Sequence, residues 1–306
     1  MKRLLVTGLD GFVGCVVQNM IEHREADARF ELVVPSTTIE LLDPASLAKA
    51  IEETHPDMVL HLAAQSFVPS SISDPHATYN VNFFGTLNLL EALKACGFSG
   101  RMLYISSGDV YGLVAPDELP IAETHAVRPR NPYAVSKAAA ELLCYQWTQN
   151  HAFDIVLARP FNHVGPGQAD WFVVSDFAKQ IVEIRLGLRE PVIRVGAIDV
   201  TRDFTDVRDV ARAYFMLLKE GAKGEIYNVC SGQEQRIRDV LERLIVLAGV
   251  NCRIEQDQAR VRPSEQKRIF GSFAKLRERT GWQPVITLEQ SLRNVLLYWE
   301  NRLKHD

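Results

Sequence analysis

The stretch VTGLDGFVG, residues 6–14, follows a short apolar run and opens a segment with helical spacing. Its glycines suit a turn from strand to helix. Gly8 permits a tight turn, Gly11 lets backbone N–H groups approach a pyrophosphate, and Gly14 allows close packing of the helix. Three glycines also suit an ordinary turn, but these stand at the first strand of an alternating α/β pattern. We therefore predict a dinucleotide-binding loop.

Apolar runs alternate with amphipathic stretches from this loop to about residue 163, and the alternation loosens after that point. The pattern predicts an α/β fold, a doubly wound parallel Rossmann sheet with a smaller α/β substrate-binding lobe. We expect residues 1–162 to form the cofactor-binding domain, with 203–231 returning to it. Residues 163–202 and 232–306 then form the interleaved second lobe.

The composition is that of an ordinary soluble protein, with 306 residues, 47% of them hydrophobic and 24% charged. The net charge of −4 argues against a nucleic-acid surface. No apolar run approaches the roughly 20 residues that cross a bilayer. The five cysteines have no CxxC spacing. We expect a cytoplasmic protein with no metal, nucleic-acid or membrane partner.

The residues that end the second apolar run bear on the choice of cofactor. An acid there favours NAD, because it binds the ribose 2′-hydroxyl. Ser36, Thr37 and Thr38 supply neither an acid nor an arginine. Hydroxyl groups would meet a 2′-phosphate without repulsion, so both NADPH and NADH remain possible.

The stretch RNPYAVSK, residues 130–137, predicts a catalytic helix. Asn131 is a good N-cap and Pro132 suits the first helical position. Tyr133 and Lys137 then lie four residues apart on one face. An ammonium group beside a phenol lowers the pKa of that phenol towards neutrality and can also bind a cofactor ribose. A solvated tyrosine and lysine would share this spacing by chance, but the glycine loop upstream favours catalysis.

Five motifs follow one another in the order typical of one known family. They are TGLDGFVG (7–14), HLAA (61–64), SSGDVYG (106–112), YAVSK (133–137) and RPFNHVGPGQ (159–168). With this set the chain resembles the extended short-chain dehydrogenase/reductase family over nearly its whole length. The resemblance implies one active site for hydride transfer, with Ser107, Tyr133 and Lys137 as the catalytic triad.

The resemblance also implies the residues that bind NADPH or NADH. They are Gly8, Gly11, Phe12, Val13, Gly14, Glu40, Leu41, Ala63, Ala64, Gln65, Tyr133, Lys137 and Arg159. Glu40 and Leu41 fall where the family contacts adenine. The chain departs from the family pattern at Glu40, where aspartate is commoner, and at Cys15, which follows the last glycine.

Within the family, the chain is most similar to enzymes that dehydrate GDP-mannose or reduce the resulting 4-keto sugar. That similarity implies Ser107, Gly108, Asp109, Asn162, Val174, Lys179, Arg202, Arg262 and Glu265 as substrate contacts. The two arginines and the lysine suit a diphosphate. Glu265 would pair with guanine, or merely with a neighbouring cation. Guanine itself is implied only by the resemblance.

The segment 107–109 separates the two activities. The dehydratases have a hydroxyl residue, then an acid or hydroxyl, then a glutamate that removes the C5 proton. Here Gly108 has no side chain and Asp109 is one methylene shorter. We therefore expect Ser107 to hold a carbonyl, and elimination to be absent.

The expected reaction is NAD(P)H-dependent reduction of the 4-keto group of GDP-4-dehydro-6-deoxy-D-mannose. The product would be a GDP-6-deoxyhexose such as GDP-D-rhamnose for polysaccharide synthesis, with GDP-6-deoxy-D-talose left open. The alternatives are GDP-mannose 4,6-dehydration, another nucleotide-sugar epimerase or dehydratase, and an NAD(P)-sensing regulator without catalysis.

Two long helical patterns, 79–96 and 131–149, are apolar on more than one face. Covering a sheet requires only one apolar face. Family members pair these helices between subunits, so we expect a homodimer with a four-helix interface. The alternative is that both helices are buried within one subunit.

Overall fold

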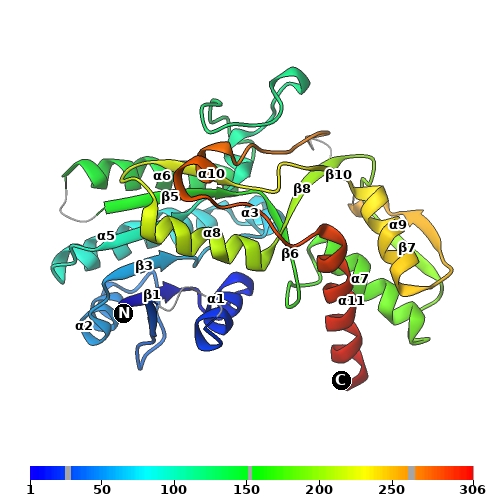
Figure 1. Cartoon of the computed structure of the whole chain (residues 1–306), viewed down its shortest axis with the longest axis horizontal. Coiled ribbons are helices and arrows are strands. Elements are labelled where there is room, and N and C mark those ends of the chain that lie inside the picture. The colour runs from blue at the N-terminus through cyan, green and yellow to red at the C-terminus, as the bar shows by residue number, and fades with distance from the viewer. Residues whose placement is uncertain (25–28, 151–153, 261–265, 306) are drawn as a thin grey trace.

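A computed structural model describes residues 1–24, 29–150, 154–260 and 266–305. Figure 1 shows a larger lobe built around a sheet and, beside it, a smaller lobe that contains α7, α9 and α11. In the described part of the chain, no helix is both long and apolar enough to span a membrane.

Among the described residues, six parallel strands form the central sheet in the order β2-β1-β3-β4-β5-β9. Their bounds are β1 Lys2–Thr7, β2 Phe30–Val33, β3 Met58–His61, β4 Arg101–Ile105, β5 Asp154–Pro160 and β9 Ile226–Val229. The order reverses between β1 and β3, where such sheets bind their ligands. The predicted doubly wound parallel sheet is confirmed.

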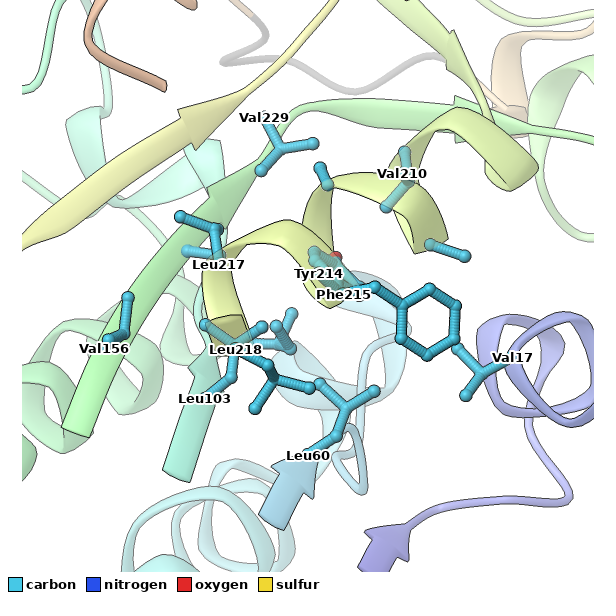
Figure 2. Close-up of a cluster of buried hydrophobic side chains, with 14 of the residues drawn as sticks. Val17, Leu60, Leu103, Val156, Val210, Tyr214, Phe215, Leu217, Leu218 and Val229 are labelled. Carbon is cyan, nitrogen blue, oxygen red and sulfur yellow. The ribbon is translucent and has the colours of Figure 1, made fainter. Parts of the chain in front are cut away.

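Helices cover both faces of this sheet, because strand residues alternate between two cores. Leu4 packs with α1 (Phe12–Glu22) and α8 (Val207–Glu220), whereas Leu5 packs with the helices of the opposite face. Those helices are α2 (Pro44–Thr54), α5 (Gly85–Ala95) and α6 (Pro132–Asn150). Figure 2 shows the first core, where Leu103 and Val156 of the strands meet Leu217 of α8.

Short elements connect the sheet to the helices. They are α3 (Val68–Ser73), α4 (Pro75–Tyr79), a π-helical turn η1 (Asn80–Phe84), the 3-10 turns η2 (Gly108–Tyr111), η3 (Pro116–Glu118) and η4 (Gln258–Arg260), and α10 (Ala274–Thr280). Asn131 caps α6 as predicted, since its Oδ1 accepts a hydrogen bond of 2.8 Å from the Ala134 N–H. Tyr133 and Lys137 therefore lie in the first two turns of that helix.

The second lobe has its own hydrophobic core. It contains α7 (Val173–Arg185), α9 (Ile237–Ala248), α11 (Leu288–His305), the sheet of β6 (Asn162–Val164), β8 (Thr201–Asp206) and β10 (Glu234–Arg236), and the pair of β7 (Val192–Val195) and β11 (Arg253–Gln256). After β8 the chain returns to the larger lobe through α8 and β9. We retain the predicted division at 162, 203 and 231 as a proposal that these separate cores support.

Candidate active site

A cavity of about 1380 Å³ lies between the two lobes. The larger lobe contributes the glycine loop, the end of β4 and the start of α6. The smaller lobe contributes residues of α7 and of the segment after β7. The carboxyl ends of the parallel strands thus face a space large enough for a dinucleotide and a sugar nucleotide.

The glycine loop forms the floor of the cavity, and its shape requires glycine. Gly8 has φ +75°, and a Cβ there would lie 2.8 Å from the Ala63 backbone. A Cβ on Gly14 would lie 2.3 Å from the Gly8 carbonyl oxygen. The loop is therefore closed onto the start of α1, whose N–H groups are available to a pyrophosphate. These residues fit a nicotinamide dinucleotide.

Tyr133 and Ser107 face each other across the reaction end of the cavity. Ser107 begins the η2 turn, where its Oγ accepts a hydrogen bond of 3.1 Å from the Asp109 N–H. The Tyr133 hydroxyl lies near enough to Ser107 for that side chain to affect the pKa of the phenol. Burial raises the pKa of the Tyr133 phenol well above its ordinary value and the Asp109 charge raises it further, although Ser107 opposes both. Tyr133 therefore rests in its protonated form, ready to act as an acid.

Lys137 is buried beside Tyr133, with a side chain only 4% exposed. Its Nζ donates a hydrogen bond of 2.7 Å to the Ile105 carbonyl and lies 5.2 Å from the centre of the Tyr104 ring. Burial lowers the pKa of Lys137 to about 8, against opposing effects of Cys144 and Glu141. The ammonium is thus charged at neutral pH in a place where charge is costly.

A buried hydrogen-bond chain holds the loop after β3. His61 Nδ1 lies 2.7 Å from Thr7 Oγ1 and its Nε2 lies 3.1 Å from Thr86 Oγ1. Burial, and then the Lys137 charge, lower the pKa of His61 to about 3, so the imidazole is neutral. Thr7 Oγ1 also accepts a hydrogen bond from the Ala63 N–H, which places the backbone of that loop against the cavity.

A second chain of hydrogen bonds ties the π-helical turn to the catalytic helix. Asn82 Oδ1 accepts from the Gln65 N–H at 2.8 Å, and its Nδ2 donates to the Gln65 carbonyl at 3.0 Å. Asn82 Nδ2 also lies 2.9 Å from Ser136 Oγ, which donates to the Tyr133 carbonyl. Gln65 thus contributes to this wall without lining the cavity itself.

The structure brings most of the predicted site residues to this one cavity. Those that line it are Gly8, Gly11, Phe12, Val13, Gly14, Ala63, Ala64, Ser107, Gly108, Asp109, Tyr133, Lys137, Asn162, Val174, Lys179 and Arg202. Lys179 and Arg202 already have protein partners. Lys179 pairs with Asp170 at 2.5 Å, and Arg202 donates to the carbonyls of Thr201 and Gln266. The predicted contacts Arg262 and Glu265 lie outside the described residues.

Four predicted cofactor residues do not line the cavity: Gln65, described above, and Arg159, Leu41 and Glu40. Arg159 makes a buried bidentate ion pair with Glu141, at 2.8 and 2.6 Å, and its contact with the cofactor stays a prediction. Leu41 packs in the core that lies between the sheet and α5. Glu40 is exposed, and its backbone N–H donates to Ser46 Oγ.

Sequence reasoning missed several aromatic residues of the cavity wall. Phe161 lies behind Gly108, and Trp171 packs with Phe67 at a centroid distance of 5.9 Å. Phe161 belongs to the motif of residues 159–168, so its position was a usable signal, whereas Trp171 lies just beyond that motif. Tyr214 also lines the cavity, but it belongs to the apolar stripe of an amphipathic helix and gave no such signal.

Comparisons with known proteins agree with this geometry. A family model described as GDP-mannose 4,6 dehydratase matches residues 16–295. GDP-6-deoxy-D-mannose reductase of Pseudomonas aeruginosa is 51% identical over 305 residues, covering 100% of this chain and 99% of that protein. GDP-mannose 4,6-dehydratase of Yersinia enterocolitica is 28% identical, covering 82% of this chain and 75% of that protein.

A solved structure, RMD from Pseudomonas aeruginosa in complex with NADPH, superposes with a TM-score of 0.94 at 51% identity. The match covers 99% of this chain and 100% of that one.

Proposed function

The chain belongs to the GDP-mannose 4,6 dehydratase family, and we propose that within it the protein is an NADPH-dependent reductase of GDP-4-dehydro-6-deoxy-D-mannose. The product is a GDP-6-deoxyhexose. Full-length similarity to a GDP-6-deoxy-D-mannose reductase supports this reaction, and the dehydratase alternative has no better support. NADPH is the proposed cofactor, because the similar solved structure contains it.

The observation that carries the choice of reductase is the packing around Gly108. A Cβ at this position would lie 3.2 Å from the Phe161 ring. The Phe161 ring also lies close to Gly271, where a Cβ would approach it to 2.6 Å. A second acid or hydroxyl group beside Ser107 therefore does not fit without movement of the wall. Elimination of water needs such a group, whereas reduction of a carbonyl does not.

The side chains at the reaction end support a simple division of labour. Bound NADPH would supply the hydride. Tyr133 gives its proton to the sugar O4 as that oxygen gains negative charge. Ser107 donates a hydrogen bond to the same oxygen, which stabilises the developing charge. The Lys137 ammonium stabilises the phenolate that remains and is placed to bind the cofactor ribose.

The smaller lobe is the proposed nucleotide site. Asn162, Val174, Lys179 and Arg202 line its part of the cavity, and the two cations suit the diphosphate of the substrate. To bind it, Lys179 would exchange the Asp170 carboxylate for a phosphate oxygen. We propose the same diphosphate and guanine roles for Arg262 and Glu265 from the family resemblance.

We further propose a homodimer. The α6 helix exposes Val135, Leu142 and Tyr145 on one side, with exposed fractions of 38%, 73% and 53%, and Phe84 is exposed near the start of α5. Large exposed apolar side chains on long helices are typical of subunit interfaces. A sedimentation mass near twice 34.4 kDa is expected at micromolar concentration. A monomer mass would contradict the dimer.

The protein also contains five free cysteines, which suits a reducing compartment, and we propose the cytoplasm.

The proposed reaction is tested with a panel of 4-keto-6-deoxy sugars linked to GDP, dTDP or UDP. NADPH absorbance should fall fastest with the GDP-linked sugar, and NMR of the product should show reduction at C4. Consumption of NADPH with the other nucleotides but not with GDP would contradict the proposed substrate. NMR also decides between the rhamnose and talose configurations.

A further inference from the structure

Tyr214 is a fully buried tyrosine whose hydroxyl makes no hydrogen bond with the described residues. It lies on α8, and its ring packs in the core on that face of the sheet, near Val210 and Phe215 (Figure 2). Apolar packing therefore explains the position of the ring. It does not explain the hydroxyl, because a buried polar group without a partner costs free energy.

The same residue lines the cavity, together with Val13 and Gly14 of α1 and Ile105 at the end of β4. Tyr214 therefore forms part of the cavity wall, although its hydroxyl is buried within that wall. Buried polar atoms in native proteins nearly always have a partner. A partner that arrives with a ligand fits both the missing hydrogen bond and the place of Tyr214 in the wall.

Tyr214 interacts electrostatically with Tyr133, which lies at the reaction end of the cavity. Burial is the main reason why the pKa of the Tyr214 phenol is raised, and the second is its electrostatic interaction with the Tyr133 phenol. The two phenols are thus near enough to interact, although they come from helices on opposite faces of the sheet. Hydride transfer requires the nicotinamide beside the carbonyl that Tyr133 protonates, so the nicotinamide is the half of the cofactor that we match to Tyr214.

We propose that the Tyr214 hydroxyl is a hydrogen-bonding contact for the nicotinamide half of the cofactor, and that its partner is the carboxamide. This inference rests on the proposed NADPH-dependent reaction. A carboxamide offers a carbonyl acceptor and an N–H donor, and a phenol pairs with either. Tyr214 thus fixes the nicotinamide from the α8 side, while Lys137 approaches from α6.

The variant Tyr214→Phe removes this one oxygen and keeps the ring. Because the hydroxyl has no protein partner, the cofactor-free full-length variant should melt at or above the wild-type temperature. Its Kd for NADPH, measured by calorimetry, should rise about five- to thirty-fold, as expected for one lost hydrogen bond. The rise in melting temperature on adding NADPH should shrink accordingly.

Tyr104→Phe is the matched control. Tyr104 is also fully buried and its hydroxyl also makes no hydrogen bond with the described residues, but it does not line the cavity. Its Kd for NADPH should stay within a factor of two of wild type. An equal loss of affinity in both variants would overturn the proposal, because it would show a general effect of removing a buried hydroxyl.

The fragment 2′-phospho-ADP-ribose separates the two halves of the cofactor, since it has the pyrophosphate but no nicotinamide. Tyr214→Phe should bind this fragment as tightly as wild type. An equal loss for NADPH and the fragment would overturn the carboxamide assignment, as would an unchanged Kd for NADPH. Failure of the wild-type protein to bind NADPH would instead contradict the proposed function.

Discussion

Lys137 lies on α6, and Arg159 lies on β5 and contacts α6. Both cations are buried, but of the two only Arg159 has a carboxylate partner among the described residues. Arg159 is 3% exposed and Lys137 is 4% exposed. Two hydrogen bonds join Arg159 to Glu141, whose hydrogen bonds and charge raise the pKa of the guanidinium although burial alone would lower it. Lys137 donates to a backbone carbonyl, and burial lowers its pKa to about 8.

Because both cations are equally buried, the ion pair with Glu141 is what separates Arg159 from Lys137, the cation that we propose acts in catalysis. A neutralised ion pair stabilises the packing between α6 and β5, and it leaves little charge for a ligand. The charge of an ammonium that contacts no carboxylate is not neutralised, so it can act on Tyr133 and on a bound cofactor. Each of the following experiments either breaks this contrast or sharpens it.

The largest effect is expected at Tyr133, the phenol beside Lys137. Tyr133→Phe keeps the ring packed and removes the proton donor, so kcat should fall about 10²–10⁴-fold in steady-state assays. KM for the keto sugar should change little. Tyr145→Phe, an exposed position on the same helix, is the control. Near-normal kcat for Tyr133→Phe at neutral pH would show that another group gives the proton.

The two cations should respond with opposite signs when each is replaced by methionine. Arg159→Met leaves Glu141 charged and buried, so the free energy of unfolding should fall by about 3–5 kcal/mol. Lys137→Met removes a charge whose pKa is depressed, so the cofactor-free protein should gain about 1–3 kcal/mol at pH 7 while losing activity. Urea unfolding measures both.

The double variant Arg159→Met/Glu141→Gln checks the reason for the loss. It removes the uncompensated carboxylate and should recover part of the lost stability. A destabilised Lys137→Met, or an unchanged Arg159→Met, would break the contrast between the two cations.

The comparison also predicts a pH dependence. In the proposed mechanism catalysis needs Lys137 charged, and burial lowers its pKa to about 8, so kcat should decline as pH rises through about 8. The Tyr133 pKa is raised, so the phenol stays protonated over this range. The unfolded chain holds the lysine proton to a higher pH, so stability should rise between about pH 8 and 10. Lys137→Met should lack this rise, which unfolding curves at several pH values would reveal.

Much of the cofactor half was predictable because its signals are local. The glycine turn and the Asn131 cap each depend on residues a few positions apart, and so does the spacing of Tyr133 and Lys137. The ion pair of Arg159 was not predictable, because its partner Glu141 lies on the preceding helix and no pattern in the sequence reveals that contact. Tyr214 was missed because periodicity does not distinguish a core tyrosine from one that reaches a cavity.

The nucleotide half was less predictable for a related reason. Lys179 and Arg202 were expected to bind the diphosphate of the substrate, but in the structure both already have protein partners. Ion pairs and hydrogen bonds to carbonyls of distant segments decide whether a cation is available to a ligand. The composition of the sequence does not predict these contacts.

The smallest effect is expected at Asp109, an exposed carboxylate on the cavity wall. Its charge raises the pKa of Tyr133, and its N–H bonds to Ser107 Oγ. Asp109→Asn keeps the N–H but removes the carboxylate that we expect to orient the sugar, so kcat/KM should fall about three- to ten-fold without loss of reduction. Asp117→Asn, on the nearby η3 turn, is the control. Unchanged kinetics with lower stability would show that Asp109 only stabilises the turn.

The most direct test of a reductase without dehydratase activity gives the unmodified enzyme each substrate in turn. With GDP-4-dehydro-6-deoxy-D-mannose and NADPH, absorbance should fall and NMR should show a GDP-6-deoxyhexose. With GDP-D-mannose and NADP⁺, NMR should show no 4-keto-6-deoxy sugar, because Gly108 brings no group to the elimination. Efficient dehydration of GDP-D-mannose would contradict the account, whatever Asp109 does.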